Sequence, residues 1–186
     1  VDREFRVMAA LGETDVPVPQ MMALSPDSEG SPIGRMFFIM EYLEGRIFWD
    51  PALGELGDDN QARFKIYDAM NKTLAQLHDV DVEGVGLGDF GRPGNYFARQ
   101  TDRWAKQYRA SEIDHNATVH AVIDWLEDHM PQDDGVVSIV HGDYRMDNMI
   151  FAKDRSDVIA VLDWELSTLG HPLADLAYQC MQWRLP

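Results

Sequence analysis

The sequence contains a single cysteine, and it lacks a long hydrophobic run. Cys180 has no partner for an internal disulfide bond, which fits a reducing compartment. No apolar stretch approaches the roughly 20 residues of a membrane-spanning helix, and no signal peptide opens the chain. These absences predict a cytoplasmic protein without a membrane segment.

Positive charge is also scarce. Lys and Arg number 16 against 32 Asp and Glu, so the formal net charge is −16. A field of this sign repels a nucleic-acid duplex and an anionic membrane surface, which argues against both as partners. The 186 residues, 45% hydrophobic and 26% charged, have the length and composition of one globular domain with its own core.

The spacing of apolar residues predicts helices separated by short strands. Both ends of the sequence fall on helical patterns, which indicates a central piece of a larger protein. The predicted helices include one ending near Gly12, one ending near His78, one that buries Phe97, Trp104 and Tyr108, an acidic one near 118–129, and an apolar one that includes Leu176 and Cys180. The predicted strands are 21–24, 36–43, 136–140, 149–151 and 158–162.

The most informative segment follows the predicted strand 136–140. The sequence H-G-D-Y-R-M-D-N (141–148) places Asp143 in a loop and Asn148 five residues later, and the next strand leads to Asp163 in V-L-D-W-E. Phosphoryl transfer from a nucleotide needs such a set: one carboxylate to accept the proton of the attacking hydroxyl, and oxygen ligands for magnesium. We therefore expect Asp143 to be the base and Asn148 and Asp163 the metal ligands. Glu165, two residues along the same predicted strand, would share the face of Asp163 and reach a second metal ion or the substrate.

These two blocks resemble the aminoglycoside phosphotransferase and choline kinase superfamily, relatives of the protein kinases. The resemblance covers the chain from Glu4 to Asp175. It implies a protein-kinase-like bilobal α+β fold, with 1–43 as the end of the nucleotide-binding N-terminal lobe and hinge, and 44–186 as most of the helical C-terminal lobe. It also implies ATP as phosphoryl donor, Mg²⁺ as cofactor and a small-molecule hydroxyl as acceptor.

The resemblance assigns roles to further positions. Glu4 matches the glutamate that pairs with the nucleotide-gripping lysine, and Glu41 and Leu43 match hinge residues whose backbone groups bind adenine. His141 would orient the catalytic loop through hydrogen bonds, and Asp175 would be a buried structural brace. The family's glycine-rich loop and its lysine should precede Glu4, and neither is in this sequence, whose first lysine is Lys65. We therefore expect the chain alone to be a poor or inactive kinase.

The acceptor is indicated by a basic segment and by a subgroup resemblance. Residues 92–109 contain five basic side chains and one acid, and Arg99, Arg103 and Lys106 share one face of the predicted helix. They would clamp an anionic group, or would form only a solvated face. The segments D-Y-R-M-D-N and N-Y-F-A-R-Q are similar to those of kinase-like domains joined to acyl-CoA dehydrogenases, which implies phosphorylation of hydroxylated acyl-CoA thioesters.

Other functions stay open at this point. Without the phosphate-gripping parts, the chain could be a nucleotide-binding or interaction module without catalysis, a metal-dependent phosphohydrolase that uses the same acids, or an aminoglycoside- or choline-type kinase with another acceptor. The remaining histidines show no H-E-x-x-H or comparable spacing, so the sequence predicts no zinc site.

Overall fold

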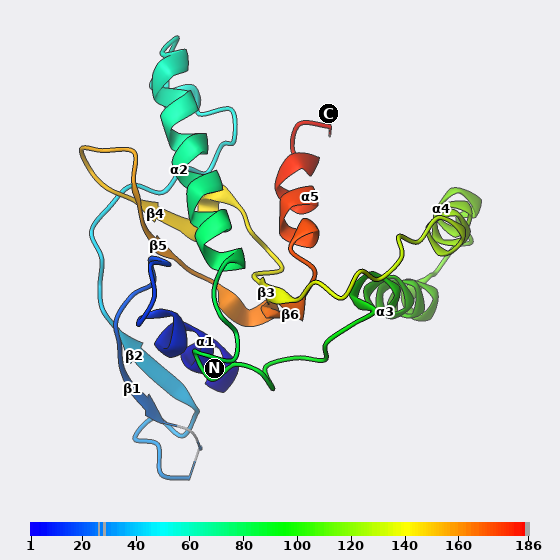
Figure 1. Ribbon diagram of the computed structural model, residues 1–186, viewed down its shortest axis with the longest axis horizontal. Helices are drawn as coiled ribbons and strands as arrows, with labels where there is room; N and C mark the ends of the chain where they lie inside the picture. Colours follow the sequence, from blue (N-terminus) through cyan, green and yellow to red (C-terminus); the bar gives the residue numbers. More distant parts are fainter. Residues whose placement is uncertain (26, 28, 185–186) are drawn as a thin grey trace.

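The N-terminal part combines one helix with a two-stranded sheet. The computed structural model describes residues 1–25, 27 and 29–184. In α1 (Asp2–Leu11) the residues Val7, Met8 and Leu11 recur at helical spacing, and all three are buried. β1 (Met21–Ser25) pairs antiparallel with β2 (Phe37–Met40), and α1 packs against both strands (Figure 1). The strand predicted over 36–43 is shorter than expected. Its antiparallel partner β1 begins at Met21, opposite Met40, and beyond that pair only the Glu41 N–H continues the pairing, to the Gln20 carbonyl.

A second small sheet lies next to the segment that follows β2. β4 (Met149–Phe151) and β5 (Val158–Val161) form an antiparallel hairpin, and Arg46 bridges to Phe151. At Gly45 a Cβ atom would collide with the Ile150 side chain and the Phe151 carbonyl oxygen. Glycine at position 45 therefore lets the segment after β2 lie directly against β4. This contact joins the N-terminal sheet to the rest of the molecule.

The helical part forms around α2 (Asn60–His78), whose first turn is capped by the Asp59 side chain accepting a hydrogen bond from the Ala62 N–H at 2.9 Å. β3 (Ser138–Val140) pairs antiparallel with β6 (Thr168–Gly170), and α2 packs against β3. The sequence did not predict β6. α5 (Leu173–Met181) follows β6 directly, and short 3₁₀ turns are at 54–56 (η1), 146–148 (η2) and 164–166 (η3).

α3 (Tyr96–Ser111) and α4 (Ala117–Asp128) form an arm that projects from this body (Figure 1). The prediction that α3 buries Phe97, Trp104 and Tyr108 is wrong. Trp104 is half exposed, Phe97 and Tyr108 are only partly buried, and Ala105 is the buried residue of the helix. The reason is that α3 packs chiefly against α4, so its apolar face is covered by one helix only.

No helix among the described residues is long and apolar enough to cross a membrane.

Candidate active site

The loop after β3 is forced into a tight turn that presents Asp143. Gly142 has φ +85°, and a Cβ atom there would lie 2.8 Å from the Leu166 carbonyl oxygen, so only glycine fits. The neighbouring Tyr144 is fully buried, and its hydroxyl donates to the Met70 carbonyl of α2 at 2.7 Å. The loop is thereby anchored on both sides of Asp143.

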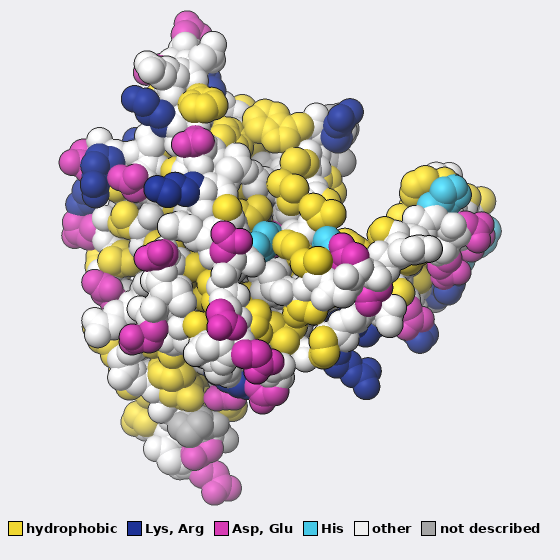
Figure 2. Space-filling model, in the orientation of Figure 1, with side chains coloured by type: hydrophobic (Ala, Val, Ile, Leu, Met, Phe, Trp, Pro, Cys, Tyr) yellow, Lys and Arg dark blue, Asp and Glu magenta, His cyan; other side chains and the backbone are white. Residues whose placement is uncertain are grey.

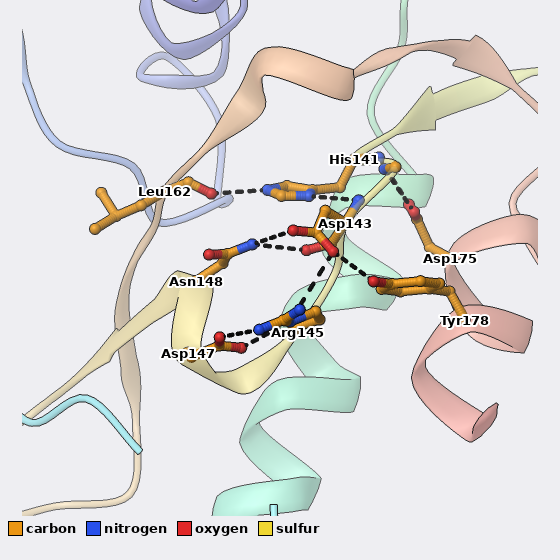
Figure 3. Close-up of polar contacts among 9 residues, drawn as sticks. His141, Asp143, Arg145, Asp147, Asn148, Leu162, Asp175 and Tyr178 are labelled. Atoms are coloured by element: carbon orange, nitrogen blue, oxygen red, sulfur yellow. Dashed lines mark hydrogen bonds and ion pairs between the residues drawn. The ribbon is translucent and has the colours of Figure 1, made fainter. Parts of the chain in front are cut away.

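His141 and Asp175 fix the backbone of the same loop (Figure 3). The Asp175 carboxylate, 1% exposed, accepts from the backbone N–H groups of His141 (2.8 Å) and Gly142 (2.9 Å). It also lies 3.2 Å from Nε2 of His78. These bonds place the buried carboxylate of α5 at the start of the loop, where it accepts two charge-assisted hydrogen bonds.

The imidazole of His141 bridges the two strands that carry the candidate residues. Its Nε2 lies 2.9 Å from the Leu162 carbonyl oxygen, and its Nδ1 accepts from the Asp143 N–H at 3.2 Å. This pattern requires the neutral tautomer with the proton on Nε2. Burial lowers the pKa of His141, although the charges of Asp175, Asp143 and Asp163 act in the opposite direction. His141 is thus a neutral bridge with both ring nitrogens occupied.

The Asp143 carboxylate accepts hydrogen bonds from two side chains, and Nε of Arg145 lies 4.0 Å from its Oδ1 (Figure 3). The Asn148 Nδ2 donates to its Oδ2 at 3.0 Å and also to the Asp143 carbonyl at 2.9 Å. The Tyr178 hydroxyl donates to Oδ1 at 2.7 Å. Tyr178 was missed by the sequence analysis, because nothing in its surroundings marks one tyrosine on an apolar helix as facing a loop 35 residues earlier.

Asn148 and Asp163 are brought together by backbone pairing. The Leu162 N–H donates to the Asn148 carbonyl at 2.8 Å, so the residue that precedes Asp163 is bonded directly to Asn148. Both Nδ2 hydrogens of Asn148 point to Asp143, which leaves its Oδ1 available as a ligand. Asp163 is exposed and has the left-handed backbone conformation, with φ 61° and ψ 60°. Asn148 and Asp163 thus supply an amide oxygen and a carboxylate from paired backbone segments, and these are ligand types that magnesium prefers.

Glu165 does not lie on a strand with Asp163, so the expectation that the two share a strand face is wrong. β5 ends at Val161, and Glu165 is in η3, because Asp163 reverses the chain and the Trp164 indole turns back to donate to the Val161 carbonyl at 2.9 Å. The Trp164 side chain is fully buried, while Glu165 is exposed and lines a cavity.

That cavity, of about 510 Å³, separates the loop that carries Asp143 from α3. Gly142 and Tyr178 line one side of it, and the α3 residues Arg103 and Trp104 line the other. A smaller cavity of about 240 Å³ is on the opposite side of Tyr178, where Arg145 and Asp147 form an ion pair. The Asp147 carboxylate raises the pKa of Arg145, and the Arg145 guanidinium lowers the pKa of Asp147.

Of the three basic residues expected to form an anion clamp, only Arg103 lines the larger cavity. The Arg99 guanidinium donates to the Arg92 carbonyl at 2.6 Å, and Lys106 pairs with Asp102 at 2.8 Å on the exposed surface. The second guanidinium in the cavity wall belongs to Arg3, which the sequence analysis did not select. It donates to the carbonyl groups of Phe90 and Ser167.

Glu4, Glu41 and Leu43 belong to the N-terminal part of the chain. Glu4 is in α1, which packs against η3 directly after Asp163. Glu41 and Leu43 are in the extended segment after β2, and both are partly buried. Within the described chain, the Leu43 N–H donates no hydrogen bond to another backbone group.

The sequence model of the phosphotransferase enzyme family matches residues 1–186. The chain belongs to this family. One similar protein is acyl-CoA dehydrogenase family member 10 of Mus musculus, which is 46% identical over 100% of this chain and 17% of that protein. Another is the probable acyl-CoA dehydrogenase IBR3 of Arabidopsis thaliana, 47% identical over 98% of this chain and 23% of that protein. The chain therefore spans about a fifth of the length of these relatives.

Solved structures establish the fold of this chain. A putative aminoglycoside phosphotransferase from Ralstonia eutropha superimposes with a TM-score of 0.92 at 50% identity, over 100% of this chain and 55% of that one. A thermostable mutant of the aminoglycoside phosphotransferase APH(4)-Ia, in complex with ADP and hygromycin B, shares the fold at 16% identity, with a TM-score of 0.68 over 98% of this chain and 61% of that one. An apo form of a thermostable APH(4)-Ia mutant gives a TM-score of 0.69 at 17% identity. The protein-kinase-like α+β fold expected from the sequence is confirmed, and the chain covers part of it.

Proposed function

We propose that this phosphotransferase moves the γ-phosphoryl group of ATP to a hydroxyl group of a small anionic metabolite. The observation that carries the proposal is the Asp143 carboxylate, held by Asn148 and Tyr178 beside a cavity with guanidinium groups in its wall. Residues 1–43 would then belong to the nucleotide-binding lobe and its hinge, and 44–186 to the catalytic lobe.

Asp143 would act as the base. Its carboxylate is fixed by two donors, so one orientation toward an incoming hydroxyl is favoured before the substrate binds. As the hydroxyl oxygen attacks the γ-phosphorus, its proton passes to Asp143, and the bond to the β–γ bridging oxygen breaks to release ADP. His141 is not an alternative base, because both of its ring nitrogens are already bonded.

Asn148 Oδ1 and the Asp163 carboxylate would hold Mg²⁺. The donor set fits the ion, since it consists of oxygen atoms only and Asn148 directs both amide hydrogens away. When bound, the ion neutralises negative charge on the β- and γ-phosphates. Glu165, exposed at the cavity rather than on the strand, would face the acceptor or a second ion.

The hinge residues would bind the nucleotide base. The Glu41 N–H donates to the Gln20 carbonyl, which fixes the segment. The Leu43 N–H has no backbone acceptor in the part of the chain that the structure describes, and it would donate to adenine. Glu4, on α1 next to η3, would pair with the phosphate-gripping lysine that the family places in a preceding strand.

The acceptor would bind in the larger cavity between the catalytic loop and α3. Its wall combines aromatic side chains with the guanidinium groups of Arg3 and Arg103, which suits an organic molecule that carries a carboxylate or phosphate. Among the described residues Arg103 forms no ion pair, so its charge is available to a ligand. The relatives named as acyl-CoA dehydrogenases make a hydroxyacyl-CoA thioester the first acceptor to test.

The test is phosphoryl transfer from labelled ATP by the full-length protein. A hydroxyacyl-CoA is compared with the same acyl-CoA lacking the hydroxyl group and with an aminoglycoside. We expect a labelled product with the first alone, and Asp143→Asn should lower kcat by about 10²–10⁴-fold. Asp154→Asn, in the exposed β4–β5 turn, is the matched control. Unchanged turnover in Asp143→Asn would refute its assignment as the base.

The anionic part of the acceptor is tested separately. Arg103→Glu should raise the KM for the acceptor and leave the KM for ATP unchanged, because it removes a charge that contacts only the acceptor. Lys106→Glu reverses the same charge less than one helical turn away, outside the cavity, and should change neither constant. Equal acceptor KM values in both variants would contradict the proposed clamp.

A further inference from the structure

Three potential metal-binding side chains meet at the junction of α3 and α4, far from the catalytic loop along the chain. Glu112 directly follows α3, His115 is in the connecting loop, and His120 is in the first turn of α4. One ligand atom from each lies within 4.8 Å of the other two. Figure 2 shows histidine side chains among acidic ones on the projecting arm.

The separations match what a metal ion requires. Nε2 of His120 lies 2.9 Å and 3.0 Å from the two carboxylate oxygens of Glu112, and Nδ1 of His115 lies 3.7 Å from Oε1. In a tetrahedral zinc site with bonds of about 2.0–2.1 Å, neighbouring ligand atoms are roughly 3.3 Å apart. The observed distances bracket this value, so small side-chain rotations would complete the site.

Two groups other than the histidines hold the Glu112 carboxylate in place. The Asn116 N–H donates to Oε1 of Glu112 at 2.9 Å, and the Tyr108 hydroxyl is 3.4 Å from the same oxygen. Hydrogen bonds to the ligands are the usual means by which proteins orient a metal site. Oε2 is left facing His120 at 3.0 Å.

The electrostatic surroundings favour a cation. The segment 111–134 contains seven acidic residues and no Lys or Arg. The rings of His115 and His120 are stacked, with centroids 4.6 Å apart, so both imidazoles lie on the same side of the α3–α4 junction. Two imidazoles with one carboxylate select zinc or a similar transition metal ion over Mg²⁺, which prefers oxygen ligands.

We propose that Glu112, His115 and His120 bind one Zn²⁺ ion or a similar divalent transition metal ion, with a fourth position open to water. The ion would join the end of α3 to the start of α4. Because these helices pack chiefly against each other and α3 supplies Arg103 and Trp104 to the larger cavity, the site would stiffen one wall of that cavity.

The test uses the chelator-treated protein, titrated with ZnCl₂ in excess Mg²⁺ so that the oxygen-rich site is occupied. Calorimetry should show one equivalent of Zn²⁺, and Co²⁺ should give the visible absorption bands of a four- or five-coordinate ion. His115→Ala and His120→Gln should each weaken binding at least tenfold. His129→Gln, which changes a histidine stacked on Trp125 outside the cluster, should bind as the parent does.

The His120→Gln variant also distinguishes a metal site from a simple hydrogen bond between His120 and Glu112. Glutamine can still donate to Glu112, so the hydrogen bond remains while the metal ligand is lost. His115 is 70% exposed, and its replacement should leave the circular dichroism spectrum unchanged. Absence of Zn²⁺ binding in the parent, or equal binding by the parent, His115→Ala and His120→Gln, would overturn the proposal.

Discussion

Replacing Asp175 by asparagine tests how strongly the loop 141–148 depends on one buried carboxylate. The change keeps the shape of the side chain and removes its charge. In the native protein, Asp175 accepts hydrogen bonds from the N–H groups of His141 and Gly142, one at each oxygen. An asparagine can accept only one of these, because its NH₂ group must face the other N–H donor.

The cost follows from these two bonds. A hydrogen bond to a charged group contributes about 1.5–3 kcal/mol, and the loss of one leaves a buried N–H without an acceptor. The second bond survives as a neutral one and weakens by roughly 1 kcal/mol. We therefore expect the free energy of unfolding to fall by about 2–4 kcal/mol, which for a chain of this length lowers the melting temperature by about 4–16 °C.

The assay is urea unfolding followed by circular dichroism and tryptophan fluorescence. Asp89→Asn is the matched control, because Asp89 is 79% exposed and its ion pair with Arg6 is at the surface. The control should leave the urea midpoint nearly unchanged. If Asp175→Asn also unfolds within about 0.5 kcal/mol of the parent, the two backbone bonds do not stabilise the loop and the reasoning is refuted.

The other predictions concern the residues that contact Asp143. Tyr178→Phe removes the donor to Oδ1 of Asp143, so kcat should fall by about 10–100-fold, while the nucleotide affinity and the melting temperature stay the same. An unchanged kcat would show that Tyr178 does not position Asp143. Burial holds the pKa of His141 below that of an unfolded histidine, so the unfolded state takes up the proton first as the pH falls. The free energy of unfolding should therefore decline as the pH falls through about 6.5, by at most about 1.4 kcal/mol per pH unit. In His141→Gln, which retains a donor for the Leu162 carbonyl, this part of the slope should vanish, and the same slope in both proteins would contradict the assignment.

Most helices and strands could be predicted from local patterns. The apolar spacing in 67–77 indicated the core helix, and α2 ends at His78 as expected. β4 has the predicted bounds, 149–151. The errors occurred where burial depends on distant chain segments. A periodic apolar face predicted that α3 would be buried, but periodicity cannot say how many neighbours cover a helix, and Trp104 remains half exposed. The predicted strand through Asp163 and Glu165 ended early, because the buried Trp164 turns the chain back.

The sequence by itself determined the chemical set of the candidate site. Asp143 and Asn148 are recognisable because they stand five residues apart in the loop after one strand, and Asp163 because it follows the next hairpin, and both patterns are local. Only the tertiary structure decided which other side chains complete the site. Tyr178 contacts Asp143 across 35 residues, and Arg3 and Arg103 enter the same cavity wall from separate helices. Such contacts depend on how helices pack against one another, and helix packing is set by the whole core rather than by the spacing of residues along the chain.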